Sequence, residues 1–101
     1  MKTSIQELDG KVVAILEGSL DTVAAAETEE ALRPLGSVED KDIVIDCTQL
    51  EYISSAGLRI FLVILQNAEE KGSHVYIKGI NDTVREIFNI TGFSNIFMFM
   101  E

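Results

Sequence analysis

Two strand-like runs stand near the start of this chain, at positions 3–8 and 11–16. Between them lies Asp9-Gly10, a pair that favours a tight hairpin turn because both residues tolerate a positive φ. The pattern therefore predicts an antiparallel hairpin at the amino end of the fold.

Three further runs predict strands at 43–47, 74–78 and 96–100. The runs at 12–16 and 43–47 are continuous rather than alternating. Continuous apolar runs are typical of strands that are covered on both faces. We therefore expect both to be central strands, and the strand at 12–16 to have both faces covered.

The tetrapeptide Gly18-Ser19-Leu20-Asp21 follows the second strand and reads as a loop. A helix is expected after it, capped by Asp21 or Thr22. Pro34 and Gly36 end this helix after about Arg33. Its expected buried stripe consists of Ala24, Ala31, Leu32 and Leu35.

Two later segments also have helical spacing of apolar residues. One follows Ser54-Ser55-Ala56-Gly57, and the other begins at Asn81 or Asp82 and ends at Gly92. The expected buried residues of the former are Leu58, Phe61, Leu62, Leu65 and Ala68, with Ile60, Val63 and Ile64 on its other side, and those of the latter are Val84, Ile87 and Phe88.

The element order is strand, strand, helix, strand, helix, strand, helix, strand. This alternation predicts an α/β fold with a mixed, mostly parallel sheet of about five strands and helices packed against it. A length of 101 residues predicts one domain spanning 1–101.

A net charge of −9 and a single cysteine narrow the classes of function. An acidic surface disfavours direct binding of nucleic acid and adsorption to anionic membranes. One cysteine allows no internal disulfide and favours a reducing compartment. No segment reads as a signal peptide or a membrane span. We expect a cytoplasmic protein that does not insert into membranes.

The candidate chemistry is sparse. His74 and Cys47 lack metal-ligand spacing, and Cys47 is expected to pack as a small hydrophobe. No glycine-rich nucleotide loop and no serine hydrolase elbow occurs. We therefore expect no metal, no cofactor and no enzyme activity. Ser54 and Ser55 stand where a helix begins, where a hydroxyl either caps the helix or carries a phosphate that the free N–H groups tolerate.

Several segments in this order resemble the STAS domain (sulfate transporter and anti-sigma factor antagonist). They are Gly18-Ser19-Leu20-Asp21, Ile43-Val44-Ile45-Asp46, Leu50 to Leu58, Val84-Arg85-Glu86-Ile87-Phe88 and Thr91-Gly92-Phe93. The resemblance covers essentially the whole chain and implies the STAS fold.

In stand-alone members of that family, the unphosphorylated antagonist binds an anti-sigma factor that is a serine kinase and so releases the sigma factor. The kinase then phosphorylates the antagonist, and a serine phosphatase resets it. The family's Asp-Ser-Ser/Thr-Gly segment matches Ser54 to Gly57, which makes Ser55 the implied phosphoacceptor and Ser54 the less favoured one. The implied partner-binding residues are Gly18, Asp21, Thr22, Ser54, Ser55, Ala56, Gly57 and Arg59.

Two alternatives stay open. A STAS domain that never takes phosphate would serve as a docking subunit of a lipid-transport ABC system or of a stress-signalling assembly. A small α/β domain could instead bind a nucleotide near Gly18 and Ser55.

Overall fold

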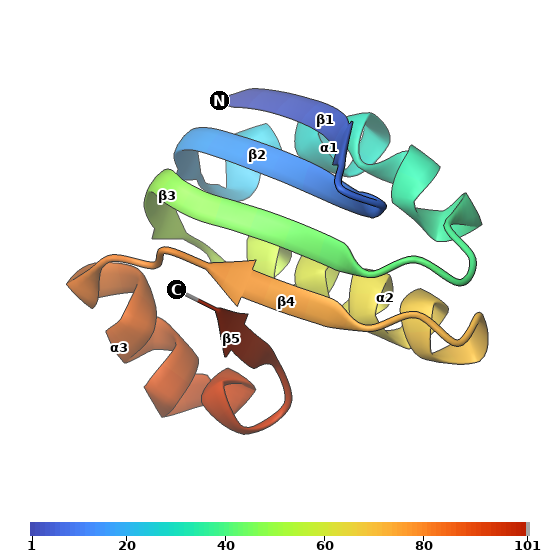
Figure 1. Ribbon diagram of the computed structural model, residues 1–101. Helices are drawn as coiled ribbons and strands as arrows, with labels where there is room; N and C mark the ends of the chain where they lie inside the picture. Colours follow the sequence, from blue (N-terminus) through green and yellow to red (C-terminus); the bar gives the residue numbers. More distant parts are fainter. Residues whose placement is uncertain (101) are drawn as a thin grey trace.

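The computed structural model describes residues 1–100 (Figure 1). Its sheet contains β1 (Lys2–Leu8), β2 (Lys11–Leu20), β3 (Ile43–Ile53), β4 (Val75–Lys78) and β5 (Met98–Met100). These strands lie side by side in that order; β1 is antiparallel to β2, and every other pair is parallel. The predicted mixed, mostly parallel sheet and the predicted element order are confirmed.

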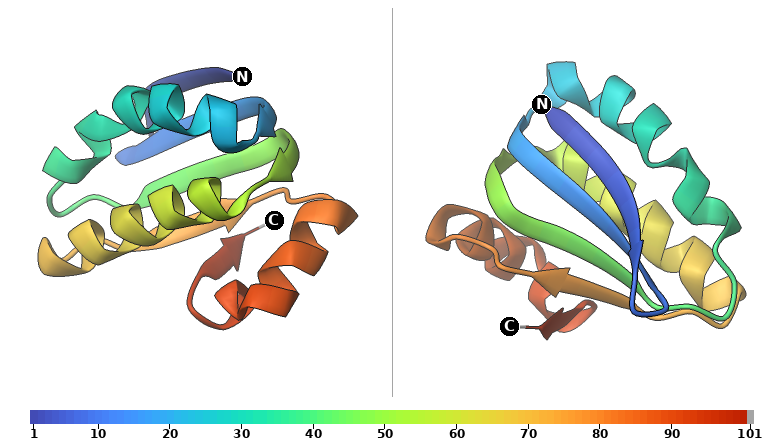
Figure 2. Two further views of the ribbon diagram at one scale, coloured as in Figure 1. Left: turned by 180° about the vertical axis from the view of Figure 1, so that it is seen from behind. Right: turned by 45° about the horizontal axis from the view of Figure 1, so that its top comes forward.

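Three α-helices connect the strands: α1 (Thr22–Ala31), α2 (Ser55–Glu70) and α3 (Asp82–Thr91). Two short 3-10 helices, η1 (Arg33–Ser37) and η2 (Phe93–Asn95), follow α1 and α3. Seen from behind, α1 and α2 lie across one face of the sheet, and α3 lies near β5 (Figure 2). None of the helices in residues 1–100 combines the length and the apolarity that a membrane span requires.

The turns and caps that have strong local signals are confirmed. Asp9 and Gly10 both have a positive φ in the turn between β1 and β2. Asn81 caps α3 by accepting a hydrogen bond from the Val84 N–H at 2.8 Å. Gly92 ends the same helix in the left-handed conformation, with φ of 82°. Each of these features depends on residues that are adjacent in sequence.

The expectation that both faces of the strand at 12–16 are covered is wrong. Val12, Ala14 and Leu16 are buried beneath the helices, whereas Val13 and Ile15 are only half-buried. Among residues 1–100, no helix crosses the sheet face that is turned toward the viewer in Figure 1. Apolar side chains on this face are shielded partly by neighbouring strands, so a continuous apolar run does not require a second layer.

Two further expectations are wrong, namely a loop at 18–21 and a third strand that ends at position 47. β2 continues to Leu20 and β3 continues to Ile53, where the two strands are paired. Gly18 adopts φ of +108° where the pairing is irregular, so a strand with a bulge runs through a segment with turn-like composition. At the far edge, β5 begins at Met98 rather than at 96.

The expected buried positions of the helices need correction. In α3, Val84 and Phe88 are buried and Ile87 is half-buried. In α1, Ala25 and Thr28 are buried, while Ala24 is half-buried and Ala31 is exposed. Helix α1 ends at Ala31, because Pro34 lies in the first turn of the separate 3-10 helix η1, which buries Leu35. In α2, Ile60 and Ile64 are buried together with Leu58, Phe61 and Ala68, whereas Leu62 and Leu65 are half-buried. A helix packed against both a sheet and a neighbouring helix buries a wider stripe than its spacing alone indicates.

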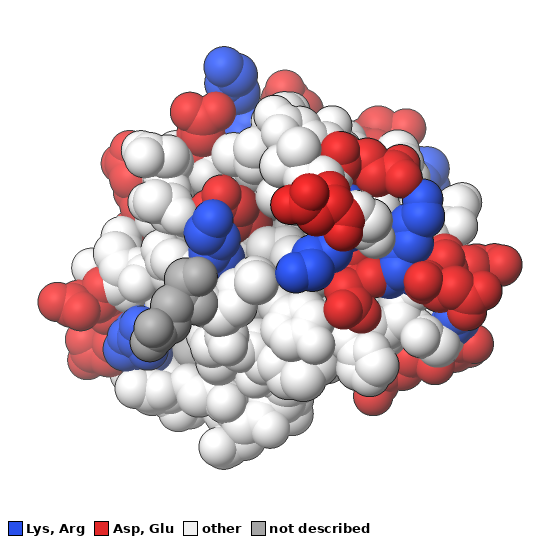
Figure 3. Space-filling view, in the orientation of Figure 1, with Lys and Arg blue, Asp and Glu red and all other residues white. Residues whose placement is uncertain are grey.

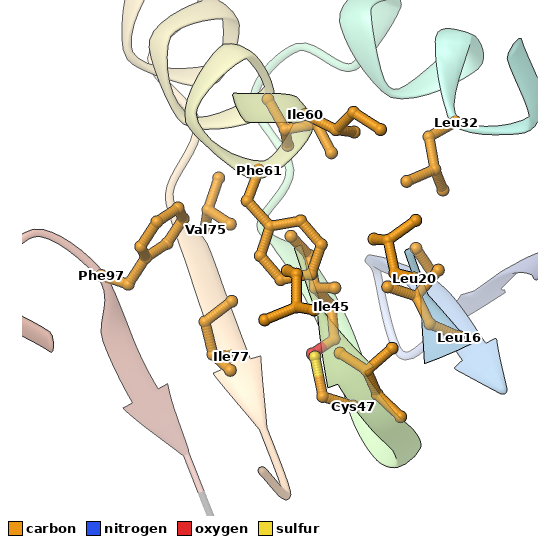
Figure 4. Packing of buried hydrophobic residues seen from close by; sticks show 14 of the residues in the cluster. Leu16, Leu20, Leu32, Ile45, Cys47, Ile60, Phe61, Val75, Ile77 and Phe97 are labelled. Carbon is orange, nitrogen blue, oxygen red and sulfur yellow. The ribbon is translucent and has the colours of Figure 1, made fainter. Parts of the chain in front are cut away.

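The core lies between the sheet and the helices and is built around Phe61 of α2 (Figure 4). Phe61 meets Phe88 and Phe97 edge to face, with ring centroids 6.2 and 6.4 Å apart. Cys47 of β3 is fully buried in this core, as predicted. Burial, followed by the charge of Asp46, raises the pKa of the Cys47 thiol to about 12. The thiol is therefore neutral and unreactive in the folded protein.

Candidate functional site

The candidate site lies where the paired strands β2 and β3 end. Leu20 and Ile53 are opposite one another in the parallel register, and the Ser54 N–H donates a hydrogen bond to the Leu20 carbonyl at 2.9 Å. Asp21 and Ser54 are the next residues of the two strands, and each caps the helix that follows it. The amino ends of α1 and α2 therefore stand side by side at one edge of the sheet.

Asp21 caps α1 with a charged side chain. Its carboxylate accepts a hydrogen bond from the Ala24 N–H at 2.8 Å, and its backbone is extended. The carboxylate is exposed, as is Thr22, the first residue of α1. At the first turn of α1, one negative charge therefore already offsets the positive end of the helix dipole.

Ser54 caps α2 from inside the protein. Its side chain accepts a hydrogen bond from the Gly57 N–H at 3.2 Å, and its carbonyl accepts one from the Leu58 N–H at 2.9 Å. Only 8% of Ser54 is exposed. Its polar groups are thus occupied by the junction between β3 and α2, and a partner has little access to them.

Ser55 differs from Ser54 in its exposure and in its hydrogen bonding. It is the first residue of α2 and is exposed. Within residues 1–100, its hydroxyl makes no hydrogen bond. The cap before it is neutral, so no carboxylate in this helix offsets the free N–H groups of the first turn. The hydroxyl that reaches solvent is the one whose local field favours an added negative charge.

Gly57 lies beneath this surface rather than on it. It is buried, and a Cβ atom at this position would lie 2.7 Å from Cγ of Leu20 and 2.8 Å from Cγ1 of Ile53. Only glycine lets the first turn of α2 approach the ends of β2 and β3 this closely. Gly57 therefore positions Ser55, and its burial keeps it away from a partner.

The other residues of the predicted partner surface are spread around this edge. Ala56 is half-buried, and Arg59 is exposed one turn beyond Ser55 on α2. Gly18 is half-buried within β2, and a Cβ atom at this position would lie 3.6 Å from the Met1 Cα. Asp21, Thr22, Ser55 and Arg59 are thus the exposed members of the predicted set.

The family model for the STAS domain matches residues 2–101 of this chain. The chain belongs to the STAS domain family. It is 32% identical, over 97 residues, to a protein named as anti-sigma factor antagonist BtrV from Bordetella bronchiseptica, and the match covers 96% of this chain and 84% of that one.

Solved structures of similar shape include two other proteins. An anti-sigma factor antagonist from Mycobacterium paratuberculosis is 26% identical with a TM-score of 0.81, and the match covers 97% of this chain and 83% of that one. SpoIIAA, a cell fate determinant of Bacillus, matches in its unphosphorylated form with a TM-score of 0.73 at 18% identity, covering 99% of this chain and 88% of that one. Its phosphorylated form matches with a TM-score of 0.72 at 19% identity, covering 99% and 92%. At these identities, the SpoIIAA comparisons establish the shared fold alone.

The sequence interpretation missed one surface residue of this STAS domain. Val23 follows Thr22 in the first turn of α1 and is 91% exposed, the largest exposure among the large apolar residues described. An apolar residue outside the buried stripe of a helix is the available signal, although single exposed apolar residues are common. Val23 adds an apolar contact to the polar surface formed by Asp21 and Thr22.

Other parts of the surface of the STAS domain include an uncharged region (Figure 3) and a groove between helices. On the face turned toward the viewer in Figure 3, acidic and basic side chains are interspersed, and the bottom of the view carries neither. Residues 87–100 contain no Asp, Glu, Lys or Arg. The groove between α1 and α2, about 250 Å³, is lined by residues such as Leu32, Ile60 and Asn67 and does not reach Ser55 or Gly18. The candidate site at the two helix ends therefore lies outside this groove.

Proposed function

We propose that this protein is an anti-sigma factor antagonist that works by partner switching. Its unmodified form binds an anti-sigma factor that is a serine kinase, and this binding releases the sigma factor. Phosphorylation of Ser55 switches the binding off, and a serine phosphatase restores it. The names of the relatives support the antagonist function.

One observation, the difference in access to the two hydroxyls, favours Ser55 over Ser54 as the phosphoacceptor. Of the two adjacent hydroxyls, that of Ser54 is buried and accepts a hydrogen bond from the Gly57 N–H. The hydroxyl of Ser55 is exposed at the first position of α2. A kinase must bring the acceptor oxygen in line with the γ-phosphorus of ATP, and only Ser55 offers this access without opening the helix.

The chemistry of the step requires no catalytic group from this chain. The Ser55 oxygen forms a bond to the γ-phosphorus of ATP, the bond between that phosphorus and ADP breaks, and the hydroxyl proton passes to the kinase. The antagonist is the substrate in this reaction and not an enzyme. Its acidic surface also suits a role that involves no direct contact with nucleic acid. We expect it to act in the cytoplasm.

The physical basis of the switch is a change at the binding surface. A phosphate adds roughly −1.5 to −2 charges at neutral pH. The free N–H groups at the start of α2 offset part of that charge, so the domain stays folded. In the complex, the same charge must be removed from water against a partner shaped for a hydroxyl. A penalty of about 1.4 kcal/mol already weakens binding tenfold.

The decisive experiment is phosphorylation by the anti-sigma factor kinase encoded in the same genome, followed by mass spectrometry. Wild type and Ser54→Ala should accept one phosphate, whereas Ser55→Ala should accept none and still bind the kinase. Phosphorylation of Ser55→Ala at an unchanged rate would refute the site. Retained binding with no phosphorylation of the wild type would instead favour a docking subunit.

A further inference from the structure

Arg59 differs from several other cationic side chains of this protein because it forms no ion pair within residues 1–100. Ion pairs join Lys2 to Glu17, Arg33 to Glu30, Lys41 to Glu7 and Lys71 to Glu39. Lys11, Lys78 and Arg85 also form no ion pair within residues 1–100. What distinguishes Arg59 among these unpaired cations is its place on the helix that begins with Ser55. Its guanidinium is exposed and available for an anion.

Arg59 stands four residues after Ser55 on the same helix. Residues four apart lie on one face of a helix, with Cβ atoms about 6 Å apart. Long side chains in a helix lean toward its amino end, so a side chain at position 59 extends over the turn that begins with Ser55. An anionic residue that precedes a cationic one by four positions is also the favourable orientation for an ion pair in a helix.

We infer that Arg59 has two alternative partners, an acidic group of the bound protein before phosphorylation and the phosphate on Ser55 afterwards. This inference rests on the proposed phosphorylation of Ser55. The planar guanidinium can donate two parallel hydrogen bonds to a carboxylate or to a phosphate. Phosphorylation then acts twice on the same surface: it adds negative charge, and it withdraws the cation that held the partner.

The first test requires neither the kinase nor any other partner. Phosphoserine is installed at position 55 during synthesis of the protein, and the arginine Nε–Hε signals are followed by NMR. The chain has three arginines, Arg33, Arg59 and Arg85, so the signals can be assigned with Arg59→Gln and Arg85→Gln variants. We expect the phosphate to shift the Arg59 signal and to leave the Arg85 signal unchanged. An unshifted Arg59 signal at low ionic strength would show that Arg59 does not bind the phosphate on Ser55 and would overturn the inference.

The second test separates the two roles of Arg59 by a double-mutant cycle. Binding to the anti-sigma factor kinase is measured for the unmodified and the phosphoserine forms, each with and without the Arg59→Gln substitution, and with Arg85→Gln as the matched control. We expect Arg59→Gln to weaken the unmodified form several-fold and to affect the phosphorylated form much less. Equal losses in both forms would show that the phosphate does not compete for Arg59.

The two tests also distinguish failure of this inference from failure of the proposed function. If the kinase does not modify Ser55, the proposed function fails even when the NMR experiment shows the ion pair. If the kinase does modify Ser55 but the Arg59 signal does not move, only the inference about Arg59 fails. Arg59→Lys provides a further readout: it keeps the charge without the paired hydrogen bonds, so it should restore part of the loss caused by Arg59→Gln.

Discussion

The amino ends of α1 and α2 lie next to each other and are capped in opposite ways. At α1, the exposed carboxylate of Asp21 caps the helix and brings a negative charge to its positive end. At α2, the buried hydroxyl of Ser54 satisfies a hydrogen bond but brings no charge. The first helical residues, Thr22 and Ser55, are both exposed hydroxyl residues.

This difference shows why one of two similar helix ends suits a phosphate. The charge of Asp21 already offsets the positive end of the α1 dipole, so a further anion at Thr22 would meet a nearby negative charge. At Ser55, the dipole and the free N–H groups of its own helix are not offset by a charged cap. Substitutions at the two helix ends test this contrast.

We expect the strongest loss of stability at the close contact that places Ser55 at the surface. Gly57→Ala should reduce the free energy of unfolding by about 1–3 kcal/mol, because the added methyl group overpacks the junction with Leu20 and Ile53. Urea unfolding measures this loss. Gly36→Ala is the matched control, because its new methyl would meet only ordinary contacts, 3.6 Å from Nδ2 of Asn67. Equal stabilities of the two variants would contradict the proposed packing role of Gly57.

The next effect compares the two caps directly. Ser54→Ala should cost about 1–2 kcal/mol of stability, because it leaves the Gly57 N–H without its acceptor in a buried position. Asp21→Ala should cost about 0.5–1 kcal/mol, because water can reach the exposed N–H groups at the start of α1. Both values come from urea unfolding at neutral pH. A larger loss for Asp21→Ala would mean that charge outweighs burial at these caps.

The smallest effect concerns the electrostatic contrast itself. Ser55→Glu should stabilise the protein by about 0.3–1 kcal/mol at low salt, because it places a negative charge at an uncompensated helix end. Thr22→Glu should gain less, since Asp21 lies directly beside it. High salt should reduce the difference, because exposed charges are screened. An equal gain at both positions would remove the electrostatic distinction between the two helices.

Local signals account for the features that the sequence interpretation predicted correctly. The Asp9-Gly10 turn, the Asn81 cap and the left-handed Gly92 each involve only neighbouring residues. The errors arise where contacts with a segment distant in sequence determine the conformation or the burial of a residue. Gly18 continues a strand because β3 pairs with it, and Val13 remains half-buried because no helix covers its face. Such outcomes depend on contacts between segments far apart in the chain.

The order of the elements, the mixed sheet and the two hydroxyls at the start of a helix can be read from the sequence alone, because the period of apolar residues and the chemistry of caps are local properties. Which of the two hydroxyls is free depends on the tertiary structure. The pairing of Leu20 with Ile53 and the absence of a side chain at Gly57 bring the start of α2 against the strand ends. That approach buries Ser54 and leaves Ser55 at the surface, because successive residues at a helix start point in different directions.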